Sequence, residues 1–158
     1  MNNSRKSLLI FFVFLTFFVM TAIFFFSSQN AASSSKTSGS VVRFILSILV
    51  RGFDDMTAKE QRRLIVKWAS FIRKAAHFTE FAALGFSFTT SLILRRTERL
   101  YLRSTAFGVL YAAFDEMHQL FSVGRACSVF DMMIDTSGYI TGLIVSALIL
   151  YIFRRRKV

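Results

Sequence analysis

Ionisable side chains are concentrated in two blocks of an otherwise apolar sequence. The first, RKAAHFTE (73–80), contains Arg73, Lys74, His77 and Glu80. The second, DEMHQLFSVGRACSVFDMMIDTSG (115–138), contains three Asp, one Glu, one His, one Gln and one Arg. Carboxylates and imidazoles can transfer protons, and guanidinium groups bind phosphate or carboxylate through paired hydrogen bonds. These two blocks therefore hold the candidate chemistry of the chain.

The candidate residues divide by the chemistry that each side chain supports. Groups able to move protons are predicted to be catalytic: Glu80, Asp115, Glu116 and His118. Groups able to hold an anion, or to position the others, are predicted to bind: Arg73, Lys74, His77, Gln119, Arg125, Asp131 and Asp135. In this interpretation His118 shuttles a proton for a neighbouring carboxylate, because an imidazole changes charge near neutral pH.

Metal binding is an open alternative for the same residues. The possible ligands are His77, Glu80, Asp115, Glu116 and His118. Their nitrogen and oxygen atoms suit Zn²⁺ or Mn²⁺. The D-E-x-H spacing lacks the two-histidine i, i+4 pattern of the zinc-binding H-E-x-x-H helix, so a metal is not favoured and the cofactor is not predicted. A serine-hydrolase site is also not favoured, because neither its residue order nor its strand–turn–helix elbow is visible.

The composition is that of a membrane protein. The 158 residues are 54% hydrophobic, include 20 Phe and no Pro, and have a mean hydropathy of +0.51. The net charge of +11 comes mainly from Lys and Arg at the ends of apolar runs, which favours anionic lipid surfaces over nucleic acid as the partner. The single Cys127 excludes an intramolecular disulfide.

Apolar runs predict an all-α polytopic bundle of four transmembrane helices in a single domain, residues 1–158. The predicted spans are approximately 8–26, 75–94, 101–121 and 132–153. Each approaches the ~20 residues that cross a bilayer as a helix. The first run could instead be a signal peptide, with Ala31 near the cleavage site. Its apolar core exceeds the ~7–15 residues of a signal peptide, so a retained anchor is favoured.

The connection 27–74 is predicted to lie outside the spans. It opens with SSQNAASSSKTSGS, which has the composition of a flexible linker. VVRFILSILV (41–50) is apolar but too short to span, and is predicted to be an interfacial or re-entrant segment. Leu64, Trp68 and Phe71 then share one helical face, which predicts an amphipathic helix that continues into the second span.

The predicted topology brings the ionisable residues to one side of the membrane. Basic residues are equally numerous on the two sides, but those before the first span favour cytoplasmic N- and C-termini. The start of span two, the end of span three and the start of span four then meet near the extracytoplasmic face. Exposure of a charge to lipid costs about 2.5–3.5 kcal/mol at the bilayer centre, so the residues are predicted to converge on a buried pocket. Gly138-x-x-x-Gly142 would allow close helix approach there.

The two blocks also resemble a known family. Over about residues 65–153, the basic pair followed by H-x-x-E, then D-E-x-H-Q, G-R and D-x-x-x-D-x-x-G, resembles the signature of the VanZ-like membrane proteins, and SSQ after the first span is typical of them. The resemblance implies a bacterial plasma-membrane protein with a cell-envelope role, and an association with resistance to the glycopeptide antibiotic teicoplanin. It implies no settled reaction and leaves the oligomeric state open.

Three function classes remain after these observations. The favoured one is recognition, with or without modification, of an anionic lipid or lipid-linked envelope precursor. A non-enzymatic binding or scaffold protein, which limits access of lipoglycopeptides or organises envelope partners, is the alternative. A proton-coupled carrier is the third, although four spans are few for one and no broken-helix repeat is evident.

Overall fold

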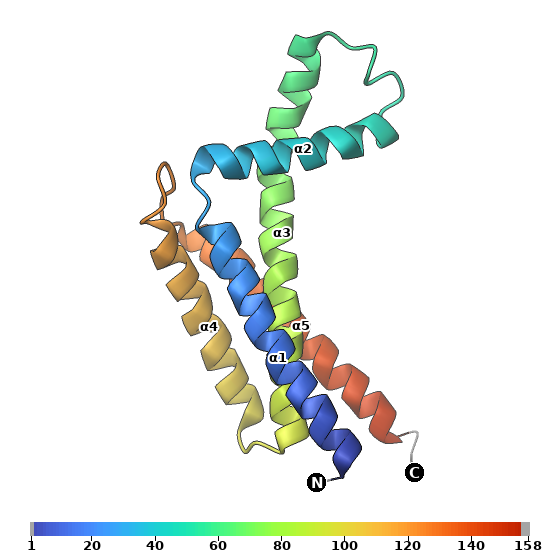
Figure 1. Ribbon diagram of the computed structural model, residues 1–158, viewed down its shortest axis with the longest axis vertical. Coiled ribbons are helices and arrows are strands. Elements are labelled where there is room, and N and C mark those ends of the chain that lie inside the picture. Colours follow the sequence, from blue (N-terminus) through green and yellow to red (C-terminus); the bar gives the residue numbers. More distant parts are fainter. Residues whose placement is uncertain (1, 156–158) are drawn as a thin grey trace.

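The computed structural model describes residues 2–155, with side chains to residue 153, and is built from helices (Figure 1). In chain order these are α1 (Asn3–Ser27), α2 (Ala31–Leu49), α3 (Ala58–Arg95), α4 (Leu100–Gln119) and α5 (Val129–Arg155). Residues 2–155 contain no strand. The all-α prediction is therefore confirmed. The side chains of the predicted basic tail, 154–157, lie outside this description.

Four helices form a bundle, and α2 lies across α3 at the end of the bundle where α1 ends (Figure 1). The most extensive packing is between α3 and α5. The buried core of the bundle takes residues from all four helices: Ile23, Phe81, Leu84, Ala112, Tyr139 and Leu143. Inside it, the hydroxyl groups of Thr89, Ser104 and Tyr139 form a hydrogen-bonded chain, with oxygens 2.7 and 2.9 Å apart.

Small residues allow α3 and α5 to approach closely. A Cβ atom added at Gly138 would overlap the carbonyl oxygen of Phe78, and one at Gly142 would overlap that of Ala82. The contact is reciprocal, because a Cβ at Gly85 would overlap the carbonyl oxygen of Tyr139. The close approach predicted from Gly-x-x-x-Gly is confirmed.

The prediction of a flexible linker is wrong, because residues 31–40 form the first half of α2. The Asn30 side chain caps this helix by accepting a hydrogen bond from the Ser33 N–H at 2.8 Å. Hydroxyl groups along the helix bond to the carbonyl one turn earlier, as Ser38 does to Ser34 at 2.9 Å. Small side chains can lie in a helix interface, so this serine-rich segment packs against α3 where composition alone indicated a linker.

The apolar segment 41–50 forms the second half of α2 and packs sideways against α3. Val42 and Leu46 are buried with Phe53 of the following turn, whereas Phe44 and Ile48 are exposed. A continuous helix lying across the bundle matches the interfacial alternative and leaves no re-entrant loop in this segment (Figure 1).

The predicted amphipathic helix and the second predicted span are one continuous helix, α3. Thr57 begins it with a capping box, in which the Glu60 carboxylate accepts hydrogen bonds from the Thr57 N–H at 2.9 Å and the Thr57 hydroxyl at 2.6 Å. The helix ends at Arg95, and Arg96 takes the left-handed conformation with φ 59°. The two halves of α3 therefore connect α2 rigidly to the bundle.

Acid should loosen the first turn of α3. The hydrogen bonds from the Thr57 side chain, and then its backbone, lower the pKa of Glu60. Because this pKa is lower in the folded state, the contribution of ionised Glu60 to stability is complete above the usual Glu pKa of about 4.3. It is lost as the pH falls through the folded-state pKa. We expect the ratio of amide exchange at 57–61 in the unchanged protein to that in a Glu60→Gln variant, which keeps the acceptor but does not titrate, to rise about two- to fivefold on acidification. Equal pH responses in the two proteins would contradict this.

In the part of the chain that the structure describes, two helices are long and apolar enough to cross a membrane: α1, over Asn3–Ser27, and α5, over Val129–Phe153. Many of their large apolar side chains are exposed, including Phe14, Phe18 and Ile144. This is consistent with a membrane protein. Four spans are not confirmed, because 75–94 and 101–121 carry more polar residues, among them the buried Thr89, Thr90 and Ser104.

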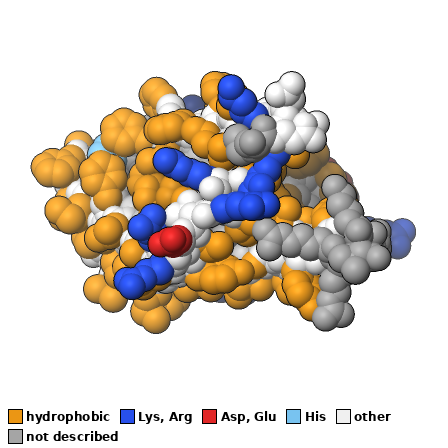
Figure 2. Space-filling model, turned by 90° about the horizontal axis from the view of Figure 1, so that it is seen from below, with side chains coloured by type: hydrophobic (Ala, Val, Ile, Leu, Met, Phe, Trp, Pro, Cys, Tyr) orange, Lys and Arg blue, Asp and Glu red, His pale blue; other side chains and the backbone are white. Residues whose placement is uncertain are grey.

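The end of the bundle at which α1 begins and α5 ends is basic (Figures 1 and 2). Figure 2 shows Lys and Arg side chains gathered on this end and apolar side chains around them. Here the Arg5 guanidinium donates a hydrogen bond to the carbonyl of Leu94 at 2.9 Å, which ties the start of α1 to the end of α3.

Candidate functional site

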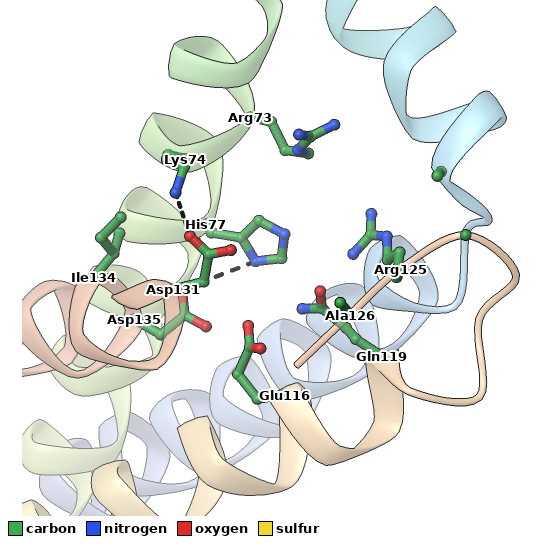
Figure 3. A pocket seen from close by; sticks show the side chains of 12 residues that line it. Arg73, Lys74, His77, Glu116, Gln119, Arg125, Ala126, Asp131, Ile134 and Asp135 are labelled. Atoms are coloured by element: carbon green, nitrogen blue, oxygen red, sulfur yellow. Dashed lines mark hydrogen bonds and ion pairs between the residues drawn. The ribbon is translucent and has the colours of Figure 1, made fainter. Parts of the chain in front are cut away.

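A polar cavity of about 210 Å³ lies where α3, α4 and α5 meet the loop 120–128 (Figure 3). Its lining consists of Ala31, Arg73, Lys74, His77, Glu116, Gln119, Gly124, Arg125, Ala126, Asp131, Ile134 and Asp135. These residues come from the four helices α2, α3, α4 and α5 and from the loop. The cavity is therefore a product of the tertiary fold.

Facing residues of α3 and α5 form one wall of the cavity. Lys74 pairs with Asp131, and one turn further the Nδ1 atom of His77 lies 4.0 Å from Oδ1 of Asp135 (Figure 3). Asp131 and Asp135 precede Gly138 on the same face of α5. The close backbone contact at Gly138 thus holds these two pairs opposite each other.

The end of α4 supplies the floor of the cavity, where two carboxylates are fixed by hydrogen bonds. Asp115 is 3% exposed, and its Oδ2 atom accepts hydrogen bonds from the Ser27 hydroxyl and the Gln119 amide, both at 2.9 Å. Glu116 is 2% exposed, and its Oε2 atom accepts a hydrogen bond from the Ser128 N–H at 2.7 Å. Helix α1 and the start of α5 thereby orient both carboxylates.

Two guanidinium groups cover the opening. Arg125 lies on the loop, and Figure 3 shows its guanidinium on the same side of the cavity as that of Arg73. Hydrogen bonds position the loop, since the Ala31 N–H donates to the Val123 carbonyl at 3.1 Å and the Ser122 hydroxyl to the Ser27 carbonyl at 3.2 Å. Burial, followed by the charge of Arg73, lowers the pKa of Arg125. Neither guanidinium forms an ion pair with the described residues.

Most of the predicted site residues lie together. The cavity lining includes eight of them: Arg73, Lys74, His77, Glu116, Gln119, Arg125, Asp131 and Asp135. Asp115 lies beside the cavity, within 4.8 Å of His77 and Asp135 by their ligand atoms. Glu80, half-buried one turn beyond His77, is not part of the lining.

Like Glu80, His118 is a predicted catalytic residue that lies outside the cavity lining. Its ring centroid lies 4.4 Å from that of Phe24 on α1 and 6.4 Å from that of Phe114. The helical period explains this placement. Asp115 and Gln119 are separated by a full turn, while His118 is rotated from both toward α1.

Two residues that orient the carboxylates were not predicted. Ser27 reaches Asp115 from the end of α1, and the Ser128 backbone reaches Glu116. The only sequence signal for Ser27 was its place in the SSQ triplet directly after the first apolar run. A backbone donor such as that of Ser128 leaves no signal in residue type.

Comparison with protein families identifies the relationship of the whole chain. The VanZ/LLP1 family model matches residues 12–153, which include α2, α3 and α4, most of α1 and α5, and the complete cavity lining. The chain belongs to the VanZ/LLP1 family. No curated protein and no solved structure matches it.

In this VanZ/LLP1 protein the two parts of the site differ in chemistry. The opening offers guanidinium groups, which bind anions through paired hydrogen bonds. The floor offers carboxylates and an imidazole, which transfer protons or ligate cations. An anion held at the opening would therefore lie next to groups able to act on it.

Proposed function

We propose that this VanZ/LLP1 protein recognises the phosphate of an anionic lipid or lipid-linked envelope precursor in the bacterial plasma membrane, and that the carboxylates below act on the bound group by proton transfer. The observation that carries the proposal is the pair of guanidiniums, Arg73 and Arg125, at a cavity that is lined by the buried carboxylates Glu116 and Asp135 and has Asp115 beside it. Teicoplanin resistance would follow if the modified lipid altered the surface that this antibiotic meets.

Two guanidiniums without an ion-pair partner among the described residues support anion binding. Lys74 is paired with Asp131, whereas Arg73 and Arg125 have no carboxylate partner among the described residues. Two like charges near each other repel, and a phosphate between them would relieve that repulsion and accept a hydrogen bond from each. Arginine suits this task because its planar fork matches phosphate geometry.

The proton-transfer role falls to the buried carboxylates at the floor of the cavity. Glu116 lines the cavity with its Oε2 atom held by Ser128, so its Oε1 atom is directed into the site. Asp115 and Glu80 lie behind it. His118 packs against Phe24 and is left out of the proposed chemistry.

The proposed topology has four spans with cytoplasmic termini. In support, Arg5 and Lys6 directly precede the first span, and basic residues there favour a cytoplasmic N-terminus although Lys and Arg are equally numerous on the two sides. The cavity lies at the opposite end of α1, beside α2 (Figure 1). It would then open toward the extracytoplasmic face, where envelope precursors are displayed, and α2 would lie along the interface.

A non-enzymatic binding or scaffold function is the second candidate. The hydrogen bonds of Asp115 with Ser27, and the Lys74–Asp131 pair, each join two helices. A buried hydrogen bond such as that of Asp115 can serve packing alone, at about 0.6–2 kcal/mol in membranes, and the Lys74–Asp131 pair, whose side chains are 35% and 39% exposed, contributes less. The observation that favours the first candidate instead is the unpaired state of Arg73 and Arg125, which a packing role does not explain.

Lipid binding should depend on Arg125. We expect the purified chain, in detergent micelles, to bind phosphatidylglycerol more tightly than diacylglycerol, which lacks the phosphate. Arg125→Gln should reduce phosphatidylglycerol affinity about tenfold or more, since hydrogen bonds to charged groups contribute about 1.5–3 kcal/mol. Native mass spectrometry of the protein with each lipid measures both quantities.

The matched control is Arg62→Gln, the same change at an exposed position of α3 far from the cavity. It should bind phosphatidylglycerol as the unchanged protein does. Equal affinity for the two lipids, or an equal response of the Arg125 and Arg62 variants, would contradict the proposal.

A further inference from the structure

Three buried atoms at the floor of the cavity have no hydrogen-bond partner among the described residues. They are Nδ1 of His77, Oδ2 of Asp135 and Oε1 of Glu116. Asp135 is 1% exposed and Glu116 is 2% exposed, so bulk water does not satisfy them. Buried polar atoms without partners are rare in proteins and call for a bound water or ion. All three are atoms that ligate metals.

In Asp115 and in Glu116, one carboxylate oxygen accepts the hydrogen bonds and the other accepts none from the described residues. Both hydrogen bonds to Asp115 go to its Oδ2 atom, from Ser27 and Gln119. The hydrogen bond to Glu116 goes to Oε2. Metal ligands are oriented in this way, because an outer shell of donors fixes one oxygen and directs the other at the ion.

The distances allow one ion to be shared. His77, Asp115 and Asp135 each offer a ligand atom, and these three atoms lie within 4.8 Å of one another. Bonds of about 2.0–2.2 Å put the ligands of a tetrahedral ion about 3.3–3.6 Å apart. The 4.0 Å between Nδ1 of His77 and Oδ1 of Asp135 is too long for a hydrogen bond and a few tenths of an ångström above this spacing. Closure of the triad by about 1 Å would complete it.

The charge balance also favours a cation. Three basic side chains line the cavity: Arg73, Lys74 and Arg125. Five carboxylates lie in or beside it: Glu80, Asp115, Glu116, Asp131 and Asp135. The carboxylates therefore outnumber the basic side chains by two. A divalent cation would stabilise their ionised forms, because burial otherwise disfavours charge on a carboxylate.

The geometry points to a divalent metal site formed by His77, Asp115 and Asp135, with Glu116 directed at it from the floor of the cavity (Figure 3). One imidazole nitrogen with carboxylate oxygens suits Mn²⁺ or Zn²⁺ rather than a metal that prefers thiolate. The single Cys127 is exposed and takes no part.

The ion would place a positive charge opposite the two guanidiniums. A phosphate between them could then contact Arg73 and Arg125 on one side and the metal on the other, as metals do when they polarise phosphoryl oxygens. This last step rests on the proposed function. The metal site itself does not, and it can be tested without lipid.

The test is titration of the purified, tag-free full chain in detergent after removal of metals by a chelator. We expect about one Mn²⁺ per chain by electron paramagnetic resonance, displaced by Zn²⁺ in competition. Asp135→Asn and His77→Gln should each weaken Mn²⁺ affinity about tenfold or more. Mn²⁺ should raise the unfolding temperature of the unchanged protein and not of these variants, since an ion bound to the folded state stabilises it.

Glu98→Gln is the matched control, because it removes an exposed carboxylate in the α3–α4 turn. It should bind Mn²⁺ as the unchanged chain does. If Asp135→Asn does not fold, Asp115→Asn replaces it, since an amide oxygen can still accept from Ser27 and Gln119. Absence of Mn²⁺ and Zn²⁺ binding by the unchanged protein, or binding that persists in folded variants, overturns the metal site. Phosphatidylglycerol binding that depends on Arg125 would still stand in that case.

Discussion

Gly142→Leu is expected to prevent the bundle from forming. A Cβ at this position would overlap the Ala82 carbonyl oxygen and approach the Phe86 amide nitrogen, both backbone atoms of α3 that cannot move without shifting the helix. Overpacking a tight contact costs about 1–3 kcal/mol, and more where only backbone can yield. Because α3 and α5 pack most extensively, we expect the variant to be absent from membranes or to elute as aggregate in size-exclusion chromatography in detergent.

Thr141→Leu is the control for this prediction. It places the same side chain on the preceding residue of α5, which is exposed, and so adds apolar surface without meeting α3. This variant should accumulate and elute as the unchanged protein does. A Gly142→Leu protein that is monodisperse and unfolds at the parental temperature would show that α3 and α5 are not packed backbone to backbone.

Replacement of Asp115 should separate the stability of the site from its chemistry. Asp115→Leu leaves two buried donors, the Ser27 hydroxyl and the Gln119 amide, without an acceptor. At about 1–3 kcal/mol for each unsatisfied group, the loss should markedly lower the unfolding temperature. Asp115→Asn keeps an acceptor oxygen in place and should fold, but it removes the charge. Loss of a proton-transfer group lowers a rate about 10²–10⁴-fold.

The measurement compares cells that produce each variant at equal membrane levels, by their envelope lipids and their teicoplanin susceptibility. The proposed activity predicts that Asp115→Asn behaves like cells without the protein. The control is Gln29→Glu, which exchanges an amide for a carboxylate at a half-buried residue outside the cavity lining. This variant should behave like the parent. If folded Asp115→Asn keeps the phenotype of the parent, the scaffold function is favoured instead.

The contact between Ser27 and Asp115 gives α1 a part in the site that its apolar sequence does not suggest. Ser27 is fully buried, and its hydroxyl and carbonyl contact α4 and the following loop. A shift of α1 along the bundle would therefore move both Asp115 and the loop that carries Arg125. This coupling follows from hydrogen bonds at two different atoms of one residue.

The sequence by itself determined which residues could share a face. His77 follows Arg73 and Lys74 by about one turn, Asp135 follows Asp131 likewise, and Gly138 and Gly142 continue that stripe, because the helical period of 3.6 fixes these relations. The cost of exposing charge to lipid then predicted that the stripes turn inward. Neither inference needed a partner to be known.

Only the tertiary structure decided which atoms meet. The rotation of α4 against α1 brings Glu116 into the cavity and places His118 against Phe24, although the two are close in sequence. Packing on α3 makes residues 31–40 helical, against the composition of that segment. Polar donors such as Ser27 and the Ser128 backbone acquire their roles through contacts between segments far apart in the chain, which residue type and spacing do not encode.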